Sequence, residues 1–133
     1  MSTTPLVYKY PYDPTGINPS NLVAAEKHTI PREETRAFAT LAGPFYTESL
    51  VVKDATGKVL TKKTDYVAFE YVSDPSEITG KEVCCAVLIK NGNISGDVFV
   101  SYQAVGGPFS LNVEAITQAI ANLEIDARSV AWG

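Results

Sequence analysis

The stretch Val83-Cys84-Cys85-Ala86-Val87-Leu88-Ile89-Lys90-Asn91-Gly92, followed by the run from Gly96 to Ala104, decides the fold that this sequence predicts. Residues 83–89 are apolar at every position, which is typical of a central strand that is covered on both faces. Asn91 and Gly92 both tolerate positive φ and together favour a hairpin turn. The second run alternates between two faces, as a strand does. We therefore predict that the two runs form an antiparallel hairpin.

Shorter strand-like runs precede this hairpin, at residues 37–41, 48–53, 58–62 and 65–72. Asp54-Ala55-Thr56-Gly57 favours a hairpin turn between the second and third of them. In the fourth, Val67, Phe69 and Tyr71 are expected to face the core. The segment with Pro75 and Gly80 is expected to be a loop. Because a single helix cannot cover so many apolar strands, we predict a mainly β protein, a two-layer antiparallel β-sandwich with an extended N-terminal arm and one short C-terminal α-helix.

The sequence divides into three parts: a Pro-rich docking arm at residues 1–31, the sandwich at 32–110, and a short helix with a tail at 111–133. Five prolines interrupt the arm, which shows no period of 2 or 3.6 and is expected to contain neither a strand nor a helix, a short helical turn at 21–28 aside. Ser110 is a plausible N-cap for the C-terminal helix. That helix has one apolar stripe at helical spacing, formed by Leu111, Ala115, Ile116, Ala119, Ile120 and Leu123.

The arm carries more apolar surface than a disordered linker, so it is expected to dock on its own domain or on a neighbouring subunit. Tyrosines suit this role because they supply large contact area with few rotatable bonds. A tryptophan close to the end of the sequence is expected either to be buried by a partner or to be followed by more of the parent chain. A chain lacking residues 1–31 is expected to fold but not to assemble. The predicted partner-binding residues are Leu6, Tyr8, Tyr10, Tyr12, Ile17 and Trp132.

The composition argues against several classes of protein. The 133 residues carry a net charge of −4, and eleven Lys and Arg are too few for the positive face that a nucleic-acid-binding protein needs. No apolar run is long enough to span a membrane, and the first twenty residues lack the pattern of a signal peptide. The adjacent Cys84 and Cys85 cannot form a CxxC site and are expected to be free thiols, which fits assembly in a reducing compartment.

Candidate chemistry is sparse in this sequence. His28 is the only histidine, which excludes a cluster of several histidine ligands, and it lies in the Pro-rich arm, a poor scaffold for a catalytic dyad. Gly106-Gly107 lacks the residues that complete a phosphate-binding loop. We expect no catalytic residue, no metal and no cofactor. Two alternatives remain open: a small hydrolase or lyase with carboxylates converging in a polar cleft, and a carbohydrate- or receptor-binding module that stacks sugars on Tyr46, Tyr66, Tyr71 or Trp132.

Several segments resemble virion structural proteins of contractile-tailed bacteriophages, in particular baseplate and tail-fibre components. The likeness spans nearly the whole chain, and the order and spacing of the segments make it moderately specific. The segments are Tyr10-Pro11-Tyr12-Asp13-Pro14-Thr15-Gly16-Ile17-Asn18-Pro19-Ser20-Asn21-Leu22-Val23, Gly43-Pro44-Phe45-Tyr46, Leu60 to Tyr66, Gly80-Lys81-Glu82-Val83, Ser101-Tyr102-Gln103-Ala104-Val105-Gly106-Gly107 and Asp126-Ala127-Arg128-Ser129-Val130-Ala131-Trp132.

This resemblance implies a non-enzymatic tail, baseplate or fibre-attachment protein that is made in the host cytoplasm and located in the virion. Its partners would be other copies of itself, as a homo-oligomer in a symmetric assembly, and other virion tail proteins, with no nucleic acid and no membrane. In the family the segment after the tryptophan often continues into a fibre or spike region, whereas this sequence ends at Gly133. A short adaptor and an N-terminal piece of a longer fibre are both consistent with that difference.

Overall fold

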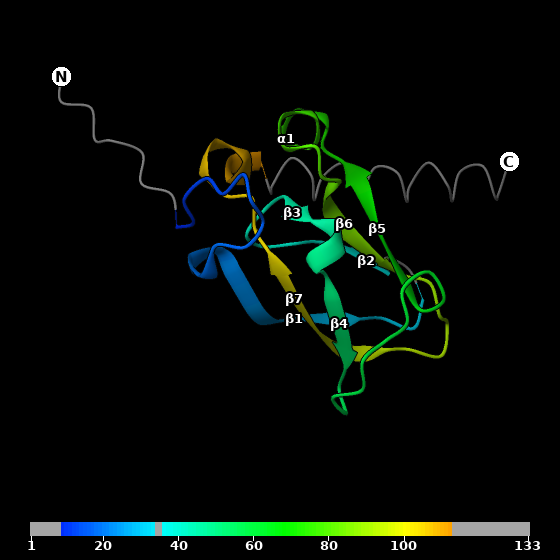
Figure 1. Ribbon diagram of the computed structural model, residues 1–133. Coiled ribbons are helices and arrows are strands. Elements are labelled where there is room, and N and C mark those ends of the chain that lie inside the picture. The colour runs from blue at the N-terminus through cyan, green and yellow to red at the C-terminus, as the bar shows by residue number, and fades with distance from the viewer. Residues whose placement is uncertain (1–8, 34–35, 113–133) are drawn as a thin grey trace, which may run out of the picture.

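The computed structural model describes residues 9–33 and 36–112. It confirms a mainly β protein in which two antiparallel sheets pack together (Figure 1). Sheet A has the strand order β1 (Leu22–Ile30), β7 (Gly96–Gln103), β4 (Val51–Asp54). In sheet B, β6 (Val83–Ile89) pairs with β2 (Ala37–Ala39), β3 (Phe45–Tyr46) and β5 (Tyr66–Tyr71). Four short helices complete the described part of the chain: η1 (Pro19–Asn21), η2 (Thr47–Ser49), α1 (Ser73–Thr79) and η3 (Gly107–Asn112).

Strand β6 is central, as its apolar sequence predicts, but it does not form a hairpin with β7. One edge of β6 pairs with β5, and the other pairs with β2 and β3. Strand β7 instead lies in sheet A between β1 and β4. The predicted hairpin is therefore wrong, because both edges of β6 are already occupied. Asn91 and Gly92 belong to a connection that crosses from one sheet to the other.

Two polar side chains hold this crossing connection against sheet B. Asp65 accepts a hydrogen bond from the Asn91 side-chain amide at 2.9 Å, and its backbone carbonyl accepts one from the Lys90 amide at 2.8 Å. The Arg36 guanidinium donates to the carbonyl oxygens of Asn91 and Ile94, at 2.7 and 2.6 Å. These contacts fix where the chain leaves β6, so local turn propensity does not decide the pairing.

The N-terminal arm contains a strand that the sequence analysis missed. Residues 22–30 form β1 and pair with β7, with a register shift between Val23 and Glu26. Ala25 has φ 55°, and its amide donates to the Ser101 hydroxyl at 3.0 Å. This is a β-bulge, which disrupts the period of 2. Since the bulge also directs Glu26 and His28 inward, the apolar alternation of an ordinary strand is absent, and the helical turn expected at 21–28 does not form.

This strand changes what can be learned from shortening the chain. Ile30 of β1 is buried in the core shared by the sheets, and the Glu26 carboxylate accepts a hydrogen bond from the Tyr102 hydroxyl of β7. Removing residues 1–31 would therefore delete an edge strand together with part of the core. A chain shortened in this way is no longer expected to fold, so the function of the arm has to be tested by single substitutions.

The core between the sheets receives the opposite face of β5 from the one predicted. Tyr66 and Ala68 pack into this core, opposite Ile89 and Val87 of β6. Phe69 lies on the other face of sheet B. The buried residues of the shared core are Ile30, Ala42, Phe45, Leu50, Val52, Leu60, Tyr66, Cys84, Val87, Ile89, Val98, Val100, Tyr102 and Ala104. Tyr66 is only 5% exposed, so a polar aromatic side chain occupies a core position that the sequence alternation alone does not indicate.

Residues 73–79 form the helix α1, where a loop was expected. Pro75 lies in the first turn, where its missing N–H costs no helical hydrogen bond, and Gly80 ends the helix with φ 74°. The predicted turn after β4 is present, since the Gly57 amide donates to the Asp54 carbonyl at 3.0 Å. Its return segment forms isolated bridges in place of a strand, between Lys53 and Val59 and between Lys62 and Tyr66.

The helix predicted for residues 111–123 falls mostly outside the described residues, as do Leu6, Tyr8 and Trp132. Ser110, its expected N-cap, belongs to η3, where its hydroxyl donates to the Gly107 carbonyl at 2.8 Å. Among the helices in the described part of the chain, none combines the length and apolar character needed to cross a membrane.

Candidate functional site

Residues 9–21 of the arm dock on their own domain. The Asp13 amide donates to the Val105 carbonyl at 2.8 Å, and the Gly107 amide donates to the Tyr10 carbonyl at 2.9 Å. The buried Asn21 side-chain amide donates to the carbonyls of Pro11 and Ala104, at 2.7 and 3.0 Å. The arm is therefore joined to the segment that leaves β7, and both lie at one end of the sandwich with η3 and α1 (Figure 1). We call this the arm end.

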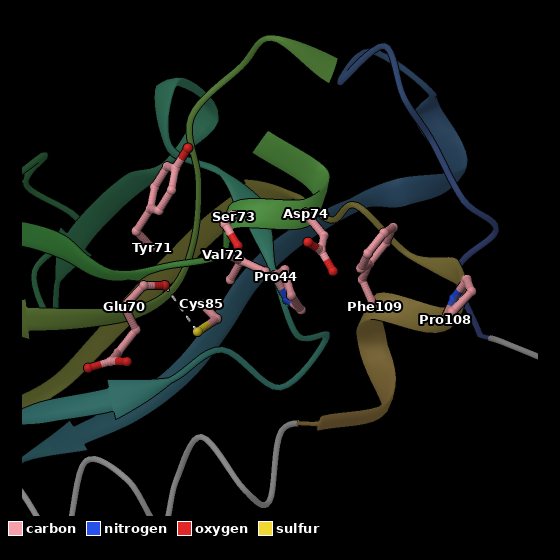
Figure 2. A pocket seen from close by; sticks show the side chains of 9 residues that line it. All are labelled: Pro44, Glu70, Tyr71, Val72, Ser73, Asp74, Cys85, Pro108 and Phe109. Atoms are coloured by element: carbon pink, nitrogen blue, oxygen red, sulfur yellow. Dashed lines mark hydrogen bonds between the residues drawn. The ribbon is translucent and has the colours of Figure 1, made fainter. Parts of the chain in front are cut away.

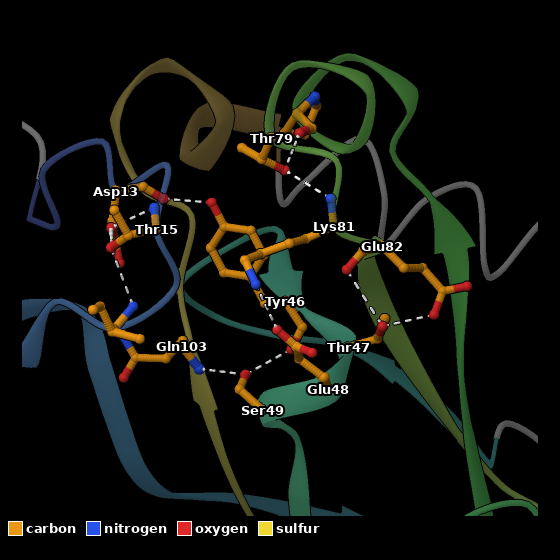
Figure 3. Close-up of polar contacts among 12 residues, drawn as sticks. Asp13, Thr15, Tyr46, Thr47, Glu48, Ser49, Thr79, Lys81, Glu82 and Gln103 are labelled. Carbon is orange, nitrogen blue, oxygen red and sulfur yellow. Dashed lines mark hydrogen bonds and ion pairs between the residues drawn. The ribbon is translucent and has the colours of Figure 1, made fainter.

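Asp13 organises the loop that precedes η1 (Figure 3). Its carboxylate accepts hydrogen bonds from the Thr15 amide at 2.9 Å, the Thr15 hydroxyl at 2.5 Å and the Asn18 amide at 3.1 Å. Burial acts to raise the pKa of this carboxyl, but these bonds outweigh it and the pKa lies below its usual value. The Tyr46 hydroxyl, deep in the domain, donates to the Asp13 carbonyl oxygen. The loop is thus fixed from both sides.

The predicted partner-binding residues within the described range have different environments. Tyr10 is half-buried and packs against the core of its own domain. Tyr12 is partly exposed, and its ring centroid lies 5.8 Å from that of Phe109 in η3. Ile17 is 78% exposed. Tyr10 therefore anchors the arm within its own chain, whereas Ile17 is fully available to a partner.

The arm end carries further exposed apolar side chains that the sequence analysis did not select. They lie at the start of β1, at the end of β5 and on α1, and Ile78 is 68% exposed. Isolated exposed apolar residues are normal on a protein surface, whereas several of them at one end of a domain are a feature of interaction sites. We call this group the arm-end surface; it consists of Tyr12, Ile17, Leu22, Tyr71 and Ile78.

A cavity of about 370 Å³ also lies at the arm end, between the end of β5, the start of α1 and η3 (Figure 2). Pro44 and Phe109 supply apolar walls, and Cys85 lies in its interior wall. Glu70 and Asp74 are the two acidic residues among those that line it. Glu70 has φ 60°, an uncommon conformation for a residue with a side chain, and its carbonyl accepts a hydrogen bond from the Cys85 thiol at 3.3 Å.

The two adjacent cysteines are free thiols, and both are buried. Burial raises the pKa of Cys84 to about 11 and that of Cys85 to about 12, and the negative charges of nearby carboxylates add to the shift. A thiol reacts as its thiolate, so both groups are unreactive at neutral pH. Cys84 packs in the shared core and Cys85 lines the cavity, which fits the predicted role of small apolar side chains.

A second polar cluster joins the two sheets beside β1. Glu26 accepts hydrogen bonds from the Tyr102 hydroxyl at 2.5 Å and from the Leu41 amide at 3.1 Å, and it contacts His28 Nε2 at 2.5 Å. The His28 ring stacks on Phe38 of β2 with centroids 3.8 Å apart. His28 therefore lies on a rigid strand, contrary to the expectation of a loosely structured arm. The spacing of Glu26 and His28 would have placed them on one face had the strand been recognised.

The chemistry of this cluster is structural. Three groups occupy the oxygens of Glu26, and burial together with the hydrogen bond to Glu26 raises the pKa of Tyr102 well above its usual range, which leaves the phenol protonated. No set of three His, Cys, Asp or Glu side chains suited to a metal ion occurs in residues 9–33 and 36–112. The cluster links β1, β7 and the β2–β3 connection.

The Glu26 cluster should make the stability of the fold pH-dependent. Burial acts to raise the pKa of Glu26, but the bonds from His28, Tyr102 and Leu41 lower it below the usual 4.5. The ionised carboxylate therefore stabilises the fold above pH 4.5, and this contribution is lost as the pH falls through the lower folded-state pKa. We expect Glu26→Gln to have a shallower dependence on pH than the natural chain in urea unfolding between pH 3 and 7. Equal slopes would contradict this assignment.

The carbohydrate-binding alternative loses two of its four candidate rings. Tyr46 and Tyr66 are both buried, so neither can stack against a sugar. Tyr71 is exposed, and Trp132 lies outside the described residues. The described rings therefore do not form the row of exposed aromatic side chains that such a module needs.

Comparisons with protein-family models, curated proteins and solved structures gave no match to this chain.

Proposed function

We propose that this chain is a structural subunit of a contractile bacteriophage tail, a baseplate or fibre-attachment adaptor located in the virion, and that it binds its neighbours through the arm end rather than catalysing a reaction. The observation that carries this proposal is the arm-end surface, where the chain presents exposed apolar side chains from segments that are themselves firmly held. The resemblance of its sequence segments to tail proteins is the reason for proposing a phage tail as the assembly in which the chain acts. The neighbours would be other copies of this chain and other tail proteins.

The way the arm is held supports this role. A surface that is ordered before binding loses little conformational entropy when a partner docks. The loop that carries Ile17 is fixed by the Asp13 carboxylate and by Tyr46, so Ile17 is presented on an ordered backbone. Tyr12 is steadied by its contact with Phe109. Both residues can therefore act as apolar contacts that are prepared for a neighbouring subunit.

Single charges on this surface test the proposal. Ile17→Asp and Ile78→Asp are expected to keep the free energy of unfolding within about 0.5 kcal/mol of the natural chain, because both positions are exposed. Each should reduce incorporation into tail particles by about tenfold or more, since a charge would be buried without a partner. Incorporation is measured as the amount of the chain in purified particles.

Val59→Asp is the matched control, because Val59 is 57% exposed but pairs with Lys53 near the end of β4, and the segment after β4 lies at the opposite end of the sandwich from α1 (Figure 1). This variant is expected to enter particles as the natural chain does. Normal incorporation of both arm-end variants would contradict the proposal, and so would an equal defect of the control.

A further inference from the structure

We propose that the cavity at the arm end binds the guanidinium group of an arginine side chain from a protein partner. This inference rests on the proposed function for the class of partner, and it adds what that partner must present. The cavity contributes the recognition chemistry, whereas the arm-end surface contributes apolar contact area.

The composition of the cavity walls favours a cation with a flat face. Asp74, in the first turn of α1, points its carboxylate into the space between Pro44 and the Phe109 ring, whereas Glu70 lines the cavity with its side chain extending away from that space (Figure 2). No positively charged side chain occurs among the described residues that line it. A guanidinium can donate two hydrogen bonds to one carboxylate while its plane stacks on an aromatic ring, whereas an ammonium group can do neither as well.

Neither the Asp74 carboxylate, which faces the cavity, nor that of Glu70 forms an ion pair in the described part of the chain. The ion pairs found there join Lys27 to Asp97, His28 to Glu26 and Lys81 to Glu48, and none involves Glu70 or Asp74. The cavity is open enough for a side chain to enter, and its volume of about 370 Å³ lies at the small end of the range for ligand sites. The apolar walls would cover the methylene stem of an arginine.

Titration of the full-length chain with N-acetyl-arginine N-methylamide, followed by amide NMR shifts, tests the cavity. We expect saturable shifts at Tyr71, Ser73, Asp74 and Phe109, with millimolar affinity that weakens as salt is added. The norleucine analogue, which has an apolar side chain and no charge, should cause no saturable shift. The lysine analogue should bind more weakly than the arginine one. Equal binding of all three, or no saturable shift with arginine, would overturn the proposal.

Asp74→Asn is expected to weaken arginine binding about fivefold or more, with Glu70→Gln having a smaller effect. Asp97→Asn serves as the control, because Asp97 is an exposed carboxylate at the start of β7 and does not line the cavity. Unchanged binding by Asp74→Asn would also overturn the proposal. The two proposals can be tested separately. If arginine binds but Ile17→Asp and Ile78→Asp enter particles normally, the proposed tail function alone is contradicted. If these variants fail to enter particles but arginine does not bind, the proposed arginine site alone is contradicted.

Discussion

Gly106→Ala should destabilise the fold by about 4 kcal/mol, because the added methyl group meets two separate obstacles. Gly106 has φ 75°, a conformation that L residues rarely adopt. A Cβ at this position would lie 2.2 Å from the Pro11 carbonyl oxygen, 2.8 Å from that of Tyr10 and 2.9 Å from the Asn21 side-chain nitrogen. All three groups belong to the docked arm. The substitution would therefore displace the arm from the segment Val105 to Gly107, and urea unfolding measures the resulting loss in the free energy of unfolding.

Gly57→Ala separates the backbone effect from the steric one. Gly57 has φ 89°, but a Cβ there would meet nothing within 4 Å. Its replacement should cost only the conformational strain, about 1 to 2 kcal/mol. Hydrogen exchange should show the difference locally. The amides of Asp13 and Gly107 form backbone hydrogen bonds between the arm and the segment Val105 to Gly107. They should lose protection in Gly106→Ala and keep it in Gly57→Ala. Equal losses of stability in the two variants would show that the arm does not rest against Gly106.

Tyr102→Phe is expected to cost about 3 kcal/mol, although it removes a single oxygen atom. The Tyr102 hydroxyl donates to the Glu26 carboxylate and accepts a hydrogen bond from the Ala42 amide at 3.1 Å. Its removal leaves a largely buried carboxylate short of one donor and a buried amide without an acceptor. Both losses are expensive because water cannot replace the missing partner. The free energy of unfolding at pH 7 is the quantity to measure.

A double-mutant cycle with Glu26→Gln assigns this cost to the proposed contact. In the Glu26→Gln background no charge remains to be stabilised, so Tyr102→Phe should cost about 1 to 2 kcal/mol less than in the natural chain. Additive effects of the two substitutions would mean that the hydroxyl and the carboxylate do not interact in solution. The conclusion that the Glu26 carboxylate links β1 to β7 through Tyr102 would then be wrong.

The sequence was sufficient to predict the sandwich and the central position of residues 83–89, because unbroken apolar runs and regular alternation are local signals. It was not sufficient for β1. That strand is stabilised by two side chains distant in the sequence: Ser101 contacts Ala25 at the bulge, and Tyr102 contacts Glu26. Ala25 and Glu26 are the positions of β1 at which the local sequence pattern looks polar or irregular. The same bulge concealed the inward-facing pair of Glu26 and His28.

The wrong hairpin has a related cause. Asn91 and Gly92 favour a reversal of the chain, but propensity does not specify which strand receives it. That choice is made by Arg36 and Asp65, which are distant in sequence, and by the occupied edges of β6. The helix α1, by contrast, could have been found, since Ser73, Asp74 and Pro75 followed by Gly80 are the ordinary signals for the start and end of a helix.

The pairing of β1 with β7 has a consequence for how the protein is made. The first described strand has the last described strand as its partner, from Leu22 opposite Gln103 to Ile30 opposite Gly96. During translation, β1 must remain unpaired until about seventy further residues have left the ribosome, and contacts of such high contact order form slowly. The segment Val105 to Gly107, to which the arm is hydrogen-bonded, leaves the ribosome later still. A nascent chain whose residues 96–107 are still inside the ribosome therefore cannot display the finished arm end, which would restrict assembly to subunits whose sandwich is complete.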